Sequence, residues 1–160
     1  MKTTKDEKWV EATLSSGQVI HFKVFPNTHY RALYEELPRE VPPEEFAVNI
    51  SLVGKMSVPV SKIVGGQSFY FRRYDVNFRP KNPDLRWIEI YESMANKGEI
   101  IPELNHIRDP KIREEFEVRY IPLMVLFRKN YYVSDGHNRV SVAKLLEWKT
   151  LKSDVWKYKS

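Results

Sequence analysis

The chain has 160 residues, of which 42% are hydrophobic and 13% aromatic, which is enough apolar material for one packed globular domain. Its 26 lysines and arginines outnumber its 21 aspartates and glutamates, and the net charge of +5 suits an anionic partner such as a nucleotide or a nucleic acid. The sequence contains no cysteine, which excludes disulfides, thiolate metal sites and every mechanism with a cysteine nucleophile.

No stretch of the sequence is apolar over a length that would cross a membrane. The longest apolar run, residues 121–127, is far shorter than the roughly 20 residues that a membrane-spanning helix requires. Residues 1–8 carry charges of both signs and lack the apolar core of a secretory signal. We therefore expect a cytoplasmic protein with no membrane partner.

The N-terminal part is predicted to form a small unit of its own. Residues 9–14 and 19–25 alternate in polarity around a short polar turn, which predicts a β-hairpin. Apolar residues at helical spacing predict a helix over residues 28–37, and a proline-rich stretch, residues 37–43, follows it. We therefore divide the chain into a β-hairpin and helix appendage, residues 1–45, and a main domain, residues 46–160.

The middle of the chain is predicted to contain two short strands and two helices. The strands cover residues 47–53 and 58–63, separated by Gly54-Lys55. The sequence Asn82-Pro83-Asp84 has the features of a helix start, and Gly98 is placed to end that helix after Lys97. A second, short helix is predicted to begin at Asp109-Pro110.

The C-terminal part alternates strands with one helix. Strands are predicted over residues 121–128 and 131–134 with a tight turn at Lys129-Asn130, then a helix over residues 138–147 and a last strand over residues 151–156. The whole pattern indicates an α+β fold with a small mixed sheet and helices packed against it.

The segment from Ser134 to Arg139 joins a strand to a helix and has the features of an anion-binding turn. The first N–H groups of a helix lack intrahelical partners and carry the positive end of its dipole, so they can bind phosphate oxygens. Gly136 allows close approach of the backbone, and side-chain donors follow it at His137, Asn138, Arg139 and Ser141. Asp135 has three possible roles, as helix cap, metal ligand or base. The alternative is an ordinary turn into a capped helix.

Residues 132–143, followed by the terminal strand at 151–155, resemble the core of the ParB/sulfiredoxin superfamily, the ParB-like nuclease/NTPase domain. In that family a glycine, two variable residues and an arginine open a helix that binds nucleotide phosphates, and Gly136-His137-Asn138-Arg139 fits this pattern. Residues 58–65 resemble the first strand and loop of that domain, and residues 121–123 resemble its central strand. The resemblance covers about residues 57–156, with an extra segment at 103–119.

The departures from the family narrow the expected activity. Sulfiredoxins have a cysteine directly before the histidine of this loop, where this chain has Gly136, so sulfiredoxin activity is excluded. ParB proteins that partition chromosomes continue into a helix-turn-helix, whereas few residues follow the loop helix here, so we do not expect that role. Family members that are nucleases or free-serine kinases share the phosphate-binding helix but use other acidic residues.

A second basic segment, residues 69–81, interleaves arginines with aromatic residues, a combination that holds phosphates and stacks bases. In the resembling family an arginine-bearing loop near this point faces the phosphate site, which implies that Arg72 or Arg73 completes it. Asp75 is the candidate for a second acid. The alternative interpretation is a partly packed loop with a solvated basic rim.

We therefore predict a nucleotide-dependent phosphotransferase or NTPase that binds a nucleoside di- or triphosphate (ATP, ADP or CTP) with Mg²⁺. Asp135 and His137 are the predicted catalytic residues, and Asp135 is also the predicted metal ligand. The predicted nucleotide ligands are Ser134, Gly136, His137, Asn138, Arg139, Ser141, Arg72 and Arg73.

Two alternatives stay open beside the enzyme. The first is a non-catalytic adaptor module that binds DNA or a nucleotide, with a second copy of the chain as a further possible partner. The second is a ParB-like nuclease, which would gather two or more carboxylates on a metal ion.

Overall fold

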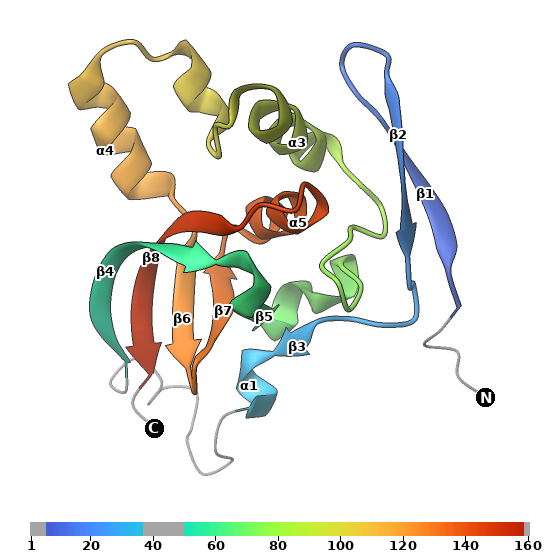
Figure 1. Cartoon of the computed structure of the whole chain (residues 1–160), viewed down its shortest axis with the longest axis horizontal. Helices are drawn as coiled ribbons and strands as arrows, with labels where there is room; N and C mark the ends of the chain where they lie inside the picture. Colours follow the sequence, from blue (N-terminus) through green and yellow to red (C-terminus); the bar gives the residue numbers. More distant parts are fainter. Residues whose placement is uncertain (1–5, 37–49, 159–160) are drawn as a thin grey trace.

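The computed structural model describes residues 6–36 and 50–158, with the backbone alone for Ser68, Phe69 and Phe71. Figure 1 shows the chain with its helices and strands labelled. The strands are β1 (Lys8–Thr13), β2 (Val19–Val24), β3 (Arg31–Ala32), β4 (Ile50–Pro59), β5 (Ile63–Gly66), β6 (Leu123–Phe127), β7 (Asn130–Asp135) and β8 (Thr150–Tyr158). The helices are α1 (Leu33–Glu36), α3 (Leu85–Lys97), α4 (Pro110–Tyr120) and α5 (His137–Leu145), with 3-10 helices at Val60–Lys62, Ser68–Arg73 and Pro102–His106.

The predicted α+β class is confirmed by a small mixed sheet with helices packed on it. Six strands form this sheet in the order β3-β5-β7-β6-β8-β4, while β1 and β2 form an antiparallel pair of their own. Within the six-stranded sheet, β4 and β8 are antiparallel, as are β6 and β7, and the remaining neighbours are parallel. Helix α5 lies between the sheet and α3 (Figure 1). None of the helices in the described residues is long and apolar enough to cross a membrane.

One core joins the hairpin, the helices and the sheet. Val10 and Phe22 of the hairpin belong to the same buried cluster as Trp87 of α3 and Val140 of α5. The ring centroids of Phe22 and Trp87 lie 5.6 Å apart. The predicted division at residues 45 and 46 falls outside the described residues, and on its N-terminal side both β1-β2 and β3 pack onto the main domain.

The helix predicted over residues 28–37 is wrong for most of its length. Only α1 is helical, and Arg31 and Ala32 pair instead with β5, while residue 37 lies outside the described residues. The cause is tertiary, because the Tyr30 ring is fully buried and stacks on Phe78 at 4.5 Å. The Tyr30 hydroxyl also donates a hydrogen bond of 2.6 Å to the Gln67 carbonyl. These contacts outweigh the local helical pattern.

The break predicted near Gly54 is a bulge rather than a gap between strands. Strand β4 runs without interruption from Ile50 to Pro59 along the nine residues of β8, and its register shifts between Leu52 and Gly54. Gly54 has a φ of 113°, which accommodates the extra residue. Residues 60–62 were predicted to continue a strand, but they form a 3-10 turn, and β5 begins at Ile63. Residues 47–49 lie outside the described residues.

The helix start predicted at Asp109-Pro110 is confirmed, whereas the start predicted at Asn82-Pro83 lies two residues later, with Asp84 as the cap. The carboxylate of Asp84 accepts a hydrogen bond of 2.9 Å from Trp87 N, so α3 begins slightly later than Asn82-Pro83 suggested, and Gly98 ends it with a φ of 66°. Asp109 caps α4 in the same way through Lys111 N. Helix α5 covers residues 137–145, close to the predicted range of 138–147.

Candidate functional site

The turn from β7 into α5 requires a glycine. Gly136 has a φ of 102°, which L side chains rarely adopt, and a Cβ at this position would lie 3.0 Å from Pro122 Cβ. No side chain caps the start of α5, because Gly136 occupies the N-cap position and has no side-chain oxygen. The first N–H groups of α5 are therefore available as donors at the positive end of the helix dipole.

A cavity of about 290 Å³ opens at this end of α5. Its wall is formed by the turn at residues 135–139, by the 3-10 helix at 68–73 and by α3, with Tyr70, Arg73, Tyr74, Arg86, Ile90 and Tyr120 as further lining residues. A second cavity of about 340 Å³, lined in part by Arg72, Lys81 and Trp87, shares Arg73, Tyr74 and Asn138 with the first. The two cavities therefore adjoin, and each is close in size to the small-molecule sites of other proteins.

Positive charge is concentrated in the first cavity, whose lining includes Arg73, Arg86 and Arg139. Glu103 holds Arg86 through two hydrogen bonds of 2.8 and 3.2 Å. Arg139 is 8% exposed, forms no ion pair among the described residues and donates a hydrogen bond of 2.8 Å from Nε to the Ile100 carbonyl. Burial lowers the pKa of Arg139, and the nearby charge of Arg86 lowers it further. A bound anion would relieve this repulsion between cations.

His137 is buried in an aromatic cluster and does not carry a charge. Its ring centroid lies 5.9, 4.9 and 6.2 Å from those of Tyr30, Tyr70 and Tyr74. The Nε2 atom is buried without a hydrogen-bond partner among the described residues, and a Cβ on Gly66 would come within 2.9 Å of it. Burial lowers the pKa of His137 to about 4, so the imidazole is neutral at pH 7. A neutral, enclosed ring positions the start of α5 and cannot act as a cationic phosphate clamp.

Tyrosines fix the polar groups at the mouth of the cavities. The Tyr74 hydroxyl donates a hydrogen bond of 2.6 Å to Asn138 Oδ1, and burial raises the pKa of Tyr74, so this phenol remains a donor. The guanidinium of Arg73 is exposed and lies 5.5 Å from the centre of the Tyr70 ring. Asn138 and Arg73 are thus held at the boundary that both cavities share.

Asp135 provides the negative charge of this cavity. It is exposed at the end of β7 and, among the described residues, is the one carboxylate that lines the cavity. Residues 6–36 and 50–158 hold no group of three histidine, aspartate or glutamate side chains arranged for a metal ion. Magnesium that is bound mainly by phosphate oxygens and water needs only one or two carboxylates, so Asp135 fits the chemistry of such an ion.

Ser141 and Ser134 do not line either cavity, although the sequence suggested both as phosphate ligands. Ser141 is fully buried, and its hydroxyl accepts a hydrogen bond of 3.0 Å from Trp87 Nε1, because this face of α5 packs against α3. Ser134 accepts a hydrogen bond of 3.1 Å from Gln67 Nε2. Of the two predicted arginines, Arg73 lines both cavities and Arg72 lines only the second.

Asp75, predicted as a second acid, holds a loop together. Its carboxylate is fully buried and accepts hydrogen bonds from the backbone N–H groups of Phe25, Asn77 and Arg79. Both carboxylate oxygens are occupied by these backbone N–H groups, and Asp75 lines neither cavity. Its role is therefore structural.

The sequence interpretation missed Arg86 and Tyr120, which both line the first cavity. Arg86 lies four residues before the buried Ile90, and helical spacing places the two on the same face of α3. That spacing is the signal that could have identified Arg86. Tyr120 ends α4, a helix without buried residues, and no sequence pattern connects it to α5.

Comparisons with protein-family models, with curated proteins and with solved structures found no match to this chain. The resemblance of residues 132–143 to the ParB/sulfiredoxin superfamily therefore stays a prediction from the sequence.

Proposed function

We propose that this chain binds a nucleoside di- or triphosphate whose phosphates lie on the first turn of α5. The observation that carries this proposal is the convergence of an uncapped helix N-terminus and three arginines on one cavity. Oriented N–H groups and guanidinium groups are the donors that proteins use for phosphate oxygens. The resemblance of Gly136-His137-Asn138-Arg139 to a nucleotide-binding motif points to the same ligand.

The polar groups of the lining have defined parts in this proposal. The N–H groups of residues 137–139 and the guanidinium of Arg139 bind one phosphate, and Arg86 adds charge from α3. The nucleoside occupies the adjoining cavity, with Arg73 and Asn138 at the boundary between phosphates and sugar. Magnesium bound by Asp135 would neutralise the phosphate charge and polarise the phosphorus.

Turnover of the nucleotide is a second candidate function, and the position of Asp135 favours it. This carboxylate is exposed at the rim of the phosphate cavity, where it can orient a metal ion or accept a proton from water or from a hydroxyl substrate. The imidazole of His137 is enclosed, so we assign it a positioning role in place of the catalytic role predicted from the sequence.

A thermal-shift panel tests the binding proposal. The ligands are ATP, ADP, CTP, GTP and pyrophosphate, each with and without Mg²⁺, on the wild type, on Arg73→Ala and on the control Arg108→Ala. Arg73 and Arg108 are both exposed, but only Arg73 lines the cavities. A ligand at about 100 times its dissociation constant stabilises a fold by about 2.7 kcal/mol. We expect a nucleotide to stabilise the wild type and the control, and to stabilise Arg73→Ala less.

Two results would contradict these proposals separately. If none of the ligands shifts the melting temperature, the nucleotide proposal fails, and DNA binding with a steep salt dependence becomes the next measurement. If nucleotide binds but the wild type releases no phosphate, the chain is a binding module rather than an enzyme. If phosphate is released, Asp135→Asn should retain binding and lose the release.

A further inference from the structure

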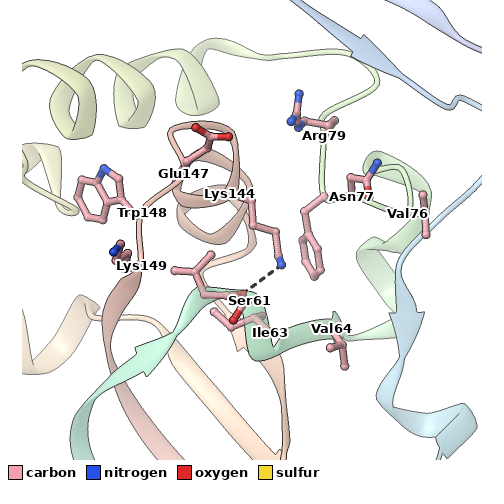
Figure 2. Close-up of a pocket in the computed structure, with 12 residues that line it drawn as sticks. Ser61, Ile63, Val64, Val76, Asn77, Arg79, Lys144, Glu147, Trp148 and Lys149 are labelled. Carbon is pink, nitrogen blue, oxygen red and sulfur yellow. Dashed lines mark hydrogen bonds between the residues drawn. The ribbon is translucent and has the colours of Figure 1, made fainter.

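A third, larger cavity lies at the opposite end of α5. It measures about 770 Å³ and is lined by residues of the α5 C-terminus, of the 3-10 helix and strand at 60–64 and of the loop at 76–79. Figure 2 shows Lys144 extending from α5 towards the backbone near Ser61. None of these residues belongs to the phosphate cavity described above.

Lys144 is a half-buried cation without a counter-ion among the described residues. Its Nζ atom donates one hydrogen bond of 3.1 Å to the Val60 carbonyl and lies 5.5 Å from the centre of the Phe78 ring. Burial lowers the pKa of Lys144, and no carboxylate acts against this effect. An ammonium group that is withdrawn from water is normally paired with an acid. Lys144 uses one of its three N–H donors for the Val60 carbonyl, so two remain for a ligand.

The remaining walls combine apolar side chains with two further cations. The apolar lining residues are Val60, Ile63, Val64, Val76, Phe78 and Trp148. Arg79 and Lys149 also line the cavity, and Arg79 Nε is buried without a hydrogen-bond partner among the described residues. Glu147 is the single acid in the lining, and it is exposed to solvent. The cavity therefore suits a ligand with an apolar body and an anionic end.

We propose that this cavity binds a small organic monocarboxylate, whose carboxylate pairs with Lys144 and whose apolar body lies against Val64, Val76 and Phe78. The cations of the lining are Lys144, Arg79 and Lys149, and the other walls are largely apolar, so a carboxylate with its single charge loses less hydration here than a phosphate dianion would. The last turn of α5 presents carbonyl groups, so it offers a dianion no additional donors. This site is independent of the nucleotide proposal, since the two cavities share no lining residue.

The test titrates the full chain with straight-chain carboxylates from butanoate to decanoate and with the corresponding neutral amides. Binding is followed by the chemical shift of the Trp148 indole N–H, because this side chain lines the cavity. We expect the carboxylates to bind at least about tenfold more tightly than the amides, as a charged hydrogen bond implies. Lys144→Met should remove this preference and leave amide binding unchanged, whereas the exposed control Lys97→Met should bind like the wild type.

A cavity-filling variant keeps the test decisive if Lys144→Met does not fold. Val76 is 49% exposed and lines the cavity, so Val76→Trp should fold and block carboxylate binding while Lys144 is retained. Three results would overturn the proposal: no saturable binding of any carboxylate by the wild type, equal affinity for carboxylates and amides, or unchanged affinity in Val76→Trp.

Discussion

The two ends of α5 differ in how their backbone polar groups are satisfied. At the N-terminus Gly136 adopts a φ of 102° and leaves the first N–H groups uncapped. At the C-terminus the carbonyls of residues 142–144 accept hydrogen bonds from the N–H groups of residues 146–148, and Glu147 takes a left-handed φ of 59° to make this possible. One end therefore offers unused donors, whereas the other end is closed.

This difference explains why the two cavities suit different anions. Three arginines join the open N–H groups at the N-terminal end, a combination that matches the several oxygens of a polyphosphate. The closed C-terminal end contributes no backbone donor, so the cations of that cavity are the side chains of Lys144, Arg79 and Lys149, set among apolar walls. If both proposals hold, a nine-residue helix carries two sites whose ligands differ in charge and polarity.

The pH dependence of the free energy of unfolding shows whether the N-terminal end of α5 encloses His137. Its pKa of about 4 lies below the ordinary 6.5, so the unfolded state binds more protons between these values. The stabilisation is complete above pH 6.5 and is lost as the pH falls towards 4, by about 3 kcal/mol. Urea unfolding of the wild type at pH 7 and pH 4.5 measures it, and His137→Gln should lack this component. Equal pH dependence of both proteins would mean that His137 is open to solvent.

The next effect concerns the glycine that leaves the helix start open. We expect Gly136→Ala to destabilise the fold by about 2 kcal/mol, because the positive φ is strained for alanine and Pro122 must move. Gly98→Ala is the matched control, since Gly98 has a φ of 66° with nothing within 4 Å of its Cβ position, and it should cost about 1 kcal/mol. Equal losses in thermal unfolding would show that contact with Pro122 does not matter.

The sequence predicted features whose causes lie within a few residues. Asp84 and Asp109 cap the helices that follow them, and Gly136 marks the turn into α5, since each acts on its own neighbours. The turn between β6 and β7 was predicted at Lys129-Asn130 but lies at Arg128-Lys129, with φ values of 50° and 70°. Such turns favour Asn-Gly, so two basic residues gave no signal for its position.

Features that depend on contacts between distant residues were not predicted. Tyr30 departs from its helical pattern because it packs on Phe78, 48 residues further along the chain. In the candidate site, Arg73 and Arg139 line the predicted cavity, whereas Arg86 reaches it only because α3 packs on α5. Ser141 was expected at the phosphate site, but a helix residue one turn beyond Gly136 can face either a ligand or the core, and local sequence does not decide between them.

Ser141 lies between the two ends of α5 and tests the packing of this helix on α3. Ser141→Ala should cost about 1–2 kcal/mol, because the buried indole N–H of Trp87 would lose its acceptor. A double-mutant cycle with Trp87→Phe isolates this hydrogen bond, since Ser141→Ala should cost little once the indole is gone. An unchanged cost in the Trp87→Phe background would show that the hydroxyl acts through another contact. Nucleotide stabilisation should persist in Ser141→Ala, as this side chain lines neither cavity.

The weakest change in stability is expected at the C-terminal end of α5. Glu147 occupies the left-handed position where glycine is favoured, so Glu147→Gly should stabilise the fold by about 0.5–1 kcal/mol in chemical unfolding. Glu147→Ala keeps the strained backbone and should change stability little, which separates the conformation from the carboxylate. If both variants stabilise equally, the negative charge near the helix C-terminus is responsible and the backbone strain is not. In that case the positive φ would affect stability at the N-terminal end of α5, at Gly136, but not at the C-terminal end, at Glu147.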